Sequence, residues 1–328
     1  MKKIFKWLLL FIVVLTVGLT VLLYNPHMIK GPLERYLSDL AGYSITLDGE
    51  LEINTGSLVQ ISAKNVSVSG PDWAVRDKLI AVEHLNLAVN TASIFSDIIL
   101  IESLEVDNLQ INLETDDKGK GNWITANRPS PPTKKESSDT IVVFNDIQAS
   151  DTTFRFLNGK KDVDNVFNIE TLSHHQQADG MLHTTLDGDL NSRSVEYTHT
   201  VGPYMNLLNG RDINYKGTGH FGELMLDGDA FIDNLLKPSQ PTFNLNMEGP
   251  NIDEITAMLG IDDLGGGGFS LRATGALING AYEADVNGKV GDISLSASAQ
   301  TPDIAEFDEV DLDVAINGPS LDSLTTVF

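Results

Sequence analysis

The chain has 328 residues, a formal net charge of -24 and a sequence pI near 4.4. So acidic a surface argues against a nucleic-acid partner, because DNA- and RNA-binding proteins neutralise phosphates with Lys and Arg. The chain contains no cysteine, which rules out a disulfide framework, a thiolate nucleophile and a zinc site built on cysteine. Its length allows either two domains of ordinary size or one long β-structure.

The first 25 residues predict an uncleaved transmembrane anchor. The 21 residues from Ile4 to Tyr24 hold one charge, Lys6, close to their N-terminal end. A helix of about 20 apolar residues crosses the hydrocarbon core of a bilayer. A cleaved signal peptide is the alternative, but it normally has a shorter apolar core and a small-residue cleavage site, which the sequence after Leu22 does not offer. The expected anchor residues are Ile4, Trp7, Leu8, Phe11, Val14, Val17, Val21 and Tyr24.

The charge pattern around this segment predicts its orientation. Lys2, Lys3 and Lys6 precede the apolar stretch, and the positive-inside bias places them in the cytoplasm. Trp7 and Tyr24 stand at the two ends of the stretch, where aromatic rings favour the membrane interface. We therefore expect everything from Asn25 onward to lie outside the cytoplasm.

The next segment, Pro26 to Gly42, predicts a short amphipathic helix. Its apolar residues recur at helical spacing, and Gly42 is a suitable C-terminal stop; the apolar residues are Ile29, Leu33, Tyr36, Leu37 and Leu40. From there the apolar period changes to two, as in Leu109, Ile111 and Leu113. Alternation of this kind predicts antiparallel strands with one apolar and one polar face.

A group of acidic residues around a glycine occurs three times and admits three interpretations. The copies are Asp48-Gly49-Glu50, Asp187-Gly188-Asp189 and Asp227-Gly228-Asp229, each after an alternating run. A calcium loop needs six or more oxygen ligands at a characteristic spacing, which is missing. A carboxylate pair for acid/base catalysis is the second possibility. The pattern favours the third, a tight hairpin turn, since Asp-Gly and Asn-Gly supply positive φ angles. Related turns are expected at Met247–Gly249, Val286–Gly288 and Ile316–Gly318.

Three Gly-Pro sequences predict short helices between strands. They begin the segments Val201–Gly210, Glu248–Gly260 and Asn317–Phe328, and Asn251 with Glu254 resembles a capping box. The last segment reaches the C-terminus without a closing strand, which suggests a longer repetitive chain. Residues 126–139, rich in Pro, Ser and charge, predict a flexible excursion.

The histidines are the best remaining candidates for chemistry. His174, His175 and His183 lie close in sequence to several Asp residues, and a metal site would need three or four of these groups to converge. Solvent-facing strand and turn positions are the favoured interpretation. No nucleophile elbow, zinc-protease helix, Walker loop or dinucleotide fingerprint is present, so we expect neither an enzyme nor a cofactor. A hydrolase using Asp187 or Asp227 is the weakest alternative.

Residues 1–125 show a characteristic order of features: an anchor, a short helix, and then Ala41–Ile53, Val66–Trp73, Leu79–Phe95, Ile98–Glu114 and Asp116–Trp123. The most specific element is the acidic turn followed by Gly121-Asn122-Trp123. In this order and in this motif the chain resembles the N-terminal region of the AsmA family of bacterial envelope proteins. The later half fits the family's repetitive body more loosely.

This resemblance implies an inner-membrane protein that projects into the periplasm. Family members resemble bridge-like lipid carriers, in which a long curled β-sheet presents an apolar groove to phospholipid acyl chains, and they are linked to outer-membrane assembly. The expected partners are phospholipid, the inner membrane and other envelope proteins. The candidate groove-lining residues are Leu104, Val106, Leu109, Ile111, Leu113, Phe243, Leu245, Met247, Ile293 and Leu295.

The alternative function is a membrane-tethered β-scaffold that binds an envelope protein without carrying lipid. The expected fold class is the same for both functions: mainly β, with an N-terminal transmembrane helix, an elongated curled antiparallel sheet and a few short amphipathic helices. The expected divisions are 1–25 for the cytoplasmic stub and anchor, 26–125 for the helix and first sheet region, 126–139 for the excursion and 140–328 for the repetitive body.

Overall fold

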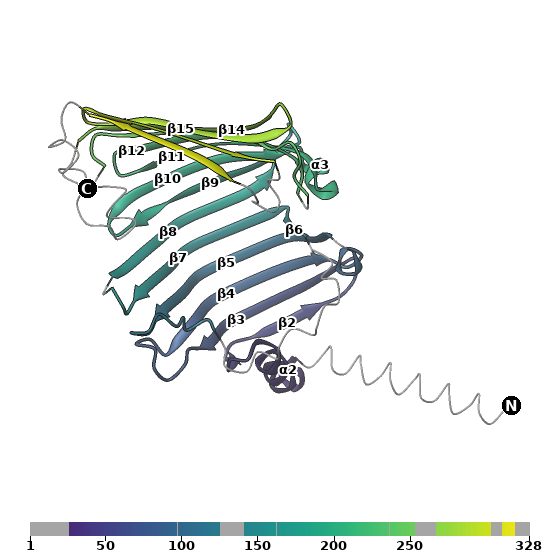
Figure 1. Ribbon diagram of the computed structural model, residues 1–328. Helices are drawn as coiled ribbons and strands as arrows, with labels where there is room; N and C mark the ends of the chain where they lie inside the picture. The colour runs from purple at the N-terminus through teal and green to yellow at the C-terminus, as the bar shows by residue number, and fades with distance from the viewer. Residues whose placement is uncertain are drawn as a thin grey trace, which may run out of the picture. The chain divides into compact units, whose positions relative to one another are not determined.

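A computed structural model describes residues 26–96, 98–124, 141–161, 163–235, 237–252, 267–302 and 310–318. These ranges contain seventeen strands, two α-helices and one short 3-10 helix, which confirms the mainly β prediction (Figure 1). The predicted anchor residues and the excursion at 126–139 lie outside the described residues. Among the helices within these ranges, none combines the length and the apolar character needed to cross a membrane.

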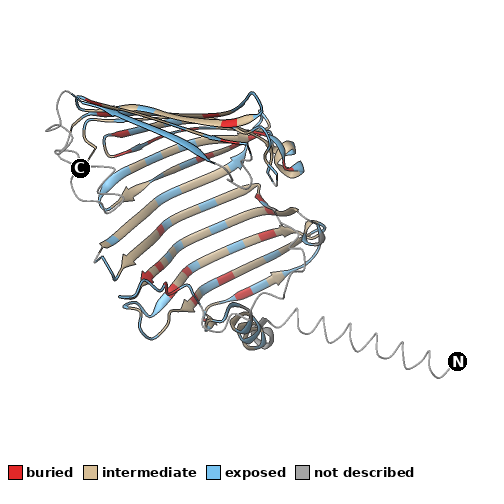
Figure 2. Cartoon of the chain, viewed as in Figure 1, coloured by how far each residue is buried: buried red, intermediate tan, exposed pale blue. Residues whose placement is uncertain are grey.

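The chain forms two compact units. Unit 1 comprises Met1–Phe144 and Ala149–Val166, and unit 2 comprises Asn145–Gln148 and Phe167–Phe328. Each unit is built around β-sheet in which most strand residues are half-buried, and fully buried residues are scattered (Figure 2).

Unit 1 is built on three long strands. β4 (Lys78–Asn90) lies between β3 (Leu58–Ser69) and β5 (Ile98–Thr115) and pairs with both in the antiparallel sense. The shorter elements are α2 (Pro26–Ala41), β1 (Ile45–Leu47), β2 (Leu51–Asn54), η1 (Ser93–Phe95), β6 (Ile141–Phe144) and β7 (Asp146–Asn158). β1 and β2 both pair with β3, and β7 pairs with β5. β6 runs parallel to β5, which departs from the all-antiparallel prediction.

Helix α2 confirms the amphipathic helix predicted from the apolar spacing and Gly42, and it lies along the edge of the sheet at β1. Gly42 has a φ of 73°, the left-handed conformation that ends a helix. Leu33 packs on the buried cluster of Leu47, Leu51 and Ala63. The amides of β1 donate to the helix: Leu47 N–H to Glu34 at 2.7 Å and Ile45 N–H to Ser38 at 2.9 Å. Tyr36 is 65 % exposed and does not belong to the packed face.

Unit 2 is an antiparallel meander in which each strand pairs with the next (Figure 1). Its strands are β8 (Val163–Gln176, paired with β9 from Phe167), β9 (Leu182–Leu190), β10 (Arg193–Gly202), β11 (Arg211–Phe221), β12 (Leu224–Asn234), β13 (Thr242–Gly249), β14 (Phe269–Ile278), β15 (Ala281–Val290), β16 (Ile293–Thr301) and β17 (Asp311–Asn317).

Helix α3 (Tyr204–Asn209) joins β10 to β11 and confirms the first Gly-Pro helix prediction. It ends at Gly210, whose φ of 63° again is left-handed. The helices predicted within Glu248–Gly260 and Asn317–Phe328 fall mostly on residues 253–266 and 319–328, which lie outside the described residues.

The tight turns of unit 2 do not lie where the acid-glycine pattern predicts them. Asn191 and Ser192 have φ values of 51° and 66°, and Asn279 and Gly280 have 51° and 89°. Two successive positive φ angles are typical of the two-residue hairpin turns that join β9 to β10 and β14 to β15. Asn-Gly is one of the two pairs expected to form hairpin turns. It forms one at Asn279-Gly280, a position that was not among those predicted.

Candidate functional site

The candidate groove residues of unit 1 all lie on β5, and four of the five face an apolar residue of β4. Leu104 pairs with Leu87 and Val106 pairs with Leu85; further along, Leu109 pairs with Val82 and Ile111 with Ile80. Leu113 lies further along β5 and is half-buried, like the other four. The two strands therefore present one apolar surface.

In the strands of unit 1 the spacing between apolar residues increases from two to three where a residue adopts the left-handed backbone conformation. Asn65 in β3, Asn108 in β5 and Asp151 in β7 have φ values of 52°, 50° and 48°. Apolar residues stand three apart across the first two, as in Ala63 and Val66, and both of these pack in the same cluster. A left-handed residue thus adds one position without moving the apolar side chains to the other face. Asn and Asp tolerate this conformation best among non-glycine residues.

The candidate residues of unit 2 lie on β13 and β16, and the strand register places them on one face. Phe243, Leu245 and Met247 face Gly275, Ala273 and Leu271 of β14. On β16, Ile293 faces Val290 and Leu295 faces Gly288 of β15; Leu295 also faces Ile316 of β17. The register of β14 with β15 connects the two groups through Leu271–Gly288 and Ala273–Val286. We call this surface of β13–β17 the apolar face.

The opposite face of the same strands is mostly polar. Asn244, Asn246 and Glu248 of β13 face Thr274, Arg272 and Ser270 of β14. Alternation therefore separates an apolar face from a mainly polar one across the five strands, and the exceptions on the polar face are Ala276, Ile278, Ala281 and Ala315.

The apolar face is covered only in part by the described residues. At one end Phe221, Leu224 and Phe269 form a buried cluster, to which Met247 and Ile252 add. Elsewhere Leu245 is 36 % exposed, and on β17 Leu312 and Val314 are 65 % and 57 % exposed. Leu295 is half-buried, whereas Ile293 is buried. The face thus keeps an accessible apolar region beside a packed end.

Two of the three acid-glycine groups lie inside strands, and the third connects two strands that run in the same direction along β3, so the interpretation of these groups as hairpin turns was wrong. Asp187-Gly188-Asp189 lies inside β9 and Asp227-Gly228-Asp229 inside β12. Their carboxylates point to the polar face and accept hydrogen bonds from the next strand, as Asp227 does from Asn246 at 2.9 Å. Asp48-Gly49-Glu50 joins β1 to β2 alongside β3, and Val286–Gly288 is likewise inside β15. Met247–Gly249 ends β13 and Ile316–Asn317 ends β17.

The glycines within these strands lie on the same face as the apolar residues. A methyl group at Gly217 would approach the hydroxyl groups of Tyr215 and Tyr197 to 2.7 and 3.0 Å. At Gly228 it would lie 2.8 Å from the carbonyl oxygen of Asn244. At Gly217 the two Tyr side chains would have to shift, and at Gly228 the contact is with a backbone atom of the neighbouring strand, so a larger residue there would push the two strands apart. The Asp-Gly-Asp pattern therefore combines two polar-face carboxylates with one small residue on the apolar side.

The three clustered histidines do not converge. His175 and His183 face each other across β8 and β9, and His183 bonds to Asp179 at 2.8 Å. His174 lies on the other face, where its Nδ1 is 2.6 Å from the hydroxyl of Thr184. Among the described residues, no group of three or more His, Asp or Glu side chains is placed to hold a metal ion.

Sequence reasoning missed His199, which completes a polar cluster with His174 and Thr184. Its Nε2 lies 3.0 Å from the Thr184 hydroxyl, and its ring lies 5.3 Å from those of Tyr197 and Tyr215. Burial lowers the pKa of His199, and the neighbouring His174 lowers it further. The neutral imidazole is therefore favoured at neutral pH, which keeps charge off this part of the sheet.

The Gly121-Asn122-Trp123 motif forms a buried polar junction in unit 1. The Asn122 side chain donates to the Asn112 carbonyl at 2.9 Å and accepts from the Glu114 amide at 3.0 Å. Glu114, also buried, accepts the amides of Val75 and Arg76 at 2.6 and 3.0 Å, just after Trp73. The motif thus joins the end of β5 to the loop between β3 and β4, so its role here is structural.

Comparison with known proteins gives one match. The family model described as AsmA family matches residues 1–148. No curated protein and no solved structure matches the chain.

Proposed function

We propose that this chain, whose residues 1–148 belong to the AsmA family, is anchored in the bacterial inner membrane and handles phospholipid on the apolar faces of its periplasmic sheets. Family membership supports a role in the cell envelope. The apolar stretch at residues 4–24 supports the anchor. The proposal that the ligand is phospholipid rests on the sheet of unit 2, which has one apolar face and one polar face.

The accessible apolar face of β13–β17 carries the proposal. Its surface combines large apolar side chains with Gly and Ala, and Leu245, Leu312 and Val314 remain accessible in the described residues. Contiguous exposed apolar patches in soluble regions commonly mark sites of interaction with lipid or protein. Removing apolar surface from water yields about 25 cal/mol for each Å², so an acyl chain laid along this face is stabilised without any directional contact.

No catalytic role is proposed for the acidic pairs. Asp187 and Asp227 lie on the polar face, where they accept hydrogen bonds from Thr171 at 3.3 Å and from Asn246 at 2.9 Å. Carboxylates that accept hydrogen bonds from a neighbouring strand stabilise the pairing of the strands. We therefore propose a non-enzymatic protein that needs no cofactor.

A membrane-tethered scaffold is the second candidate, and β17 is the observation that favours it. All seven residues of β17 are exposed, and it pairs with β16 through an antiparallel register. An exposed strand edge is a template for an added strand from a partner protein. On this view the apolar face is covered by protein instead of lipid.

Photo-crosslinking in cells with the full chain separates the two candidates. A photoreactive phenylalanine analogue at position 243 places the reactive group on the apolar face, and the same analogue at position 242 places it on the polar face of the same strand. Phospholipid adducts at 243 but not at 242 are expected. Protein adducts at 243 in place of lipid would favour the scaffold.

The substitution Leu245→Asp sharpens this test. The carboxylate would lie among acyl chains, where an unpaired charge is strongly disfavoured, so lipid adducts at position 243 should fall several-fold. The fold should persist, because Leu245 faces only Gly228 and Ala273 on the flanking strands. Thr242→Asp adds the same charge to the polar face and serves as the matched control. A loss of stability of several kcal/mol in Leu245→Asp, with no lipid adduct in the parent chain, would instead indicate a closed core.

A further inference from the structure

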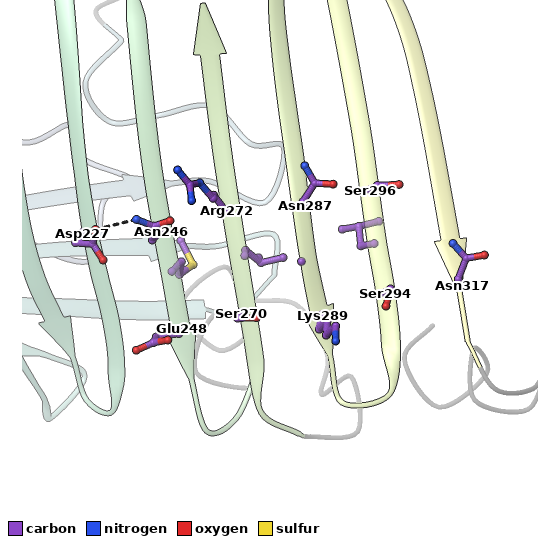
Figure 3. Close-up of a pocket in the computed structure, with 14 residues that line it drawn as sticks. Asp227, Asn246, Glu248, Ser270, Arg272, Asn287, Lys289, Ser294, Ser296 and Asn317 are labelled. Atoms are coloured by element: carbon purple, nitrogen blue, oxygen red, sulfur yellow. Dashed lines mark hydrogen bonds between the residues drawn. The ribbon is translucent and has the colours of Figure 1, made fainter.

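A cavity lies along the polar face of unit 2, and four residues of the apolar face, Met247, Leu271, Gly288 and Leu295, also contribute to its lining. It has a volume of about 650 Å³ and extends across β12 to β17. Figure 3 shows the polar residues that line it: Asp227, Asn246, Glu248, Ser270, Arg272, Asn287, Lys289, Ser294, Ser296 and Asn317. Its volume falls within the range of small-molecule sites, about 300–1,000 Å³.

The strand register arranges these residues in two parallel rows. One row runs Asp227, Asn246, Arg272, Asn287 and Ser296 across five neighbouring strands. The next runs Glu248, Ser270, Lys289, Ser294 and Asn317. Each row therefore begins with an acid, continues through one uncharged residue to a base, and ends in hydroxyl and amide groups.

Along each row the acid and the base are separated by one uncharged residue, while Arg272 has Glu248 and Asp285 as diagonal neighbours on the flanking strands. Within a row the acid and the base are two strand spacings apart, about 9.5 Å. No ion pair in the described part of the chain includes Arg272 or Lys289, and Asp227 is hydrogen-bonded to Asn246 instead. Neither base is therefore held in an ion pair by the described residues.

The two bases are close to each other and to the uncharged donors. Arg272 faces Asn287, and Lys289 stands two residues further along the same strand as Asn287, so the two bases are diagonal neighbours. Diagonal positions across strands lie about 7–8 Å apart, within reach of long side chains. Across the cavity from Asp227 and Glu248 stand Ser294 and Ser296, whose hydroxyl groups make no hydrogen bond to another side chain in the described ranges.

We propose that this cavity binds the phosphate group of a small phosphorylated polyol. The Arg272 guanidinium matches two phosphate oxygens at once, and the Lys289 ammonium adds a second charge. Ser294, Ser296 and Asn317 donate to the remaining oxygens and to hydroxyl groups of the ligand. Glu248, on the acidic side, accepts from ligand hydroxyls. The cavity is larger than a phosphate ion alone, which is why the ligand class includes a polyol body.

The ligand chemistry has two sources, a soluble phosphate ester and the glycerophosphate headgroup of a lipid. The charged residues of this site lie on the opposite face from the proposed acyl surface, so it does not depend on the proposed lipid function. A soluble ester would make it a small-molecule site, and a headgroup would make it a contact with a membrane surface.

Isothermal titration of the full chain in uncharged detergent with glycerol 3-phosphate tests the soluble source. Binding is expected, with Arg272→Gln and Lys289→Gln each weakening it by about tenfold or more. Lys289→Arg should keep most of the affinity. Lys216→Gln removes an exposed charge from the same face of β11, outside the cavity, and should change nothing.

Flotation of the full chain with phosphatidylglycerol vesicles tests the headgroup source in the same variants. Association that falls in Arg272→Gln and Lys289→Gln, but not in Lys216→Gln, would assign the site to a headgroup. Circular dichroism on each variant checks that the sheet persists. If neither glycerol 3-phosphate nor the vesicles distinguish the Arg272 and Lys289 variants from the parent, the proposal is wrong.

Discussion

Single residues decide where the strands of unit 2 can approach each other. The alternation of apolar and polar residues predicted the strands themselves, because it needs only the period of two. It did not reveal that Gly188 and Gly228 lie inside strands, since Asp-Gly has the same local signature in a turn and in a crowded strand. The difference comes from the neighbouring strand, whose carbonyl oxygens lie against these glycines. That contact is tertiary and has no local signal.

Replacing Gly188 with alanine should therefore destabilise the protein. The added methyl group would lie against the Asn168 carbonyl oxygen and 3.0 Å from the Cα atom of Ile169, both backbone atoms that cannot rotate away. We expect a loss of about 1–3 kcal/mol in the free energy of unfolding, measured by urea denaturation. Gly56→Ala is the matched control, because nothing lies within 4 Å of its added methyl group. Equal stability of the two variants would show that the strands can separate there at little cost.

In the candidate site, too, some residues can be identified from their neighbours in the sequence, and others are brought together only by the pairing of strands. The apolar positions Leu245 and Leu295 could be read from the sequence because their neighbours in the chain are polar. Arg272 and Lys289 could not be grouped in that way, since they meet only through the register of β14 with β15. His199 was missed for the same reason: its partner Thr184 is brought opposite it by the pairing of β9 with β10.

At the scale of elements, α2 protects the edge of unit 1. An edge strand exposes unpaired amides, and proteins commonly cover such edges. Here two helix residues one turn apart, Glu34 and Ser38, accept the amides of Leu47 and Ile45. Lys30 donates to the Gly49 carbonyl at 2.9 Å in the segment that follows β1. The spacing of Leu33 and Leu37 predicted the helix, but the strand that it covers follows from these polar contacts.

Removing both acceptors should loosen β1. In Glu34→Ala with Ser38→Ala, two amides at the sheet edge lose their partners, at a cost of about 1–3 kcal/mol for each buried group. Hydrogen exchange at the Leu47 amide should accelerate by at least about tenfold, because Leu47 is buried in the parent protein. Asp39→Ala, at an exposed position of the same helix, should leave this exchange rate unchanged. Unchanged exchange in the double variant would mean that packing of Leu33 alone holds the helix in place.

At the scale of the whole molecule, the sequence separates an apolar N-terminal stretch from an acidic body. The strands of both units expose a polar face, and the net charge of -24 keeps such surfaces soluble. The family match over residues 1–148 includes the apolar stretch and most of unit 1. The proposed anchor would hold the apolar sheet faces beside the membrane that supplies the lipid, so it supports the proposed function.

The anchor prediction can be tested by fractionation. Because residues 4–24 contain a single charge near one end, the full chain should remain with the inner membrane after an alkaline carbonate wash. Protease added to spheroplasts should digest the body, since Lys2, Lys3 and Lys6 favour a cytoplasmic N-terminus. Val14→Arg with Val17→Arg places two charges in the middle of the stretch, at an insertion cost of about 2.5 kcal/mol or more for each. We expect this variant to lose membrane retention, whereas Asn25→Arg, outside the stretch, should keep it. A soluble mature form of the parent beginning near Asn25 would show instead that the stretch is a cleaved signal peptide, and the lipid would then have to reach the apolar faces of a freely diffusing protein.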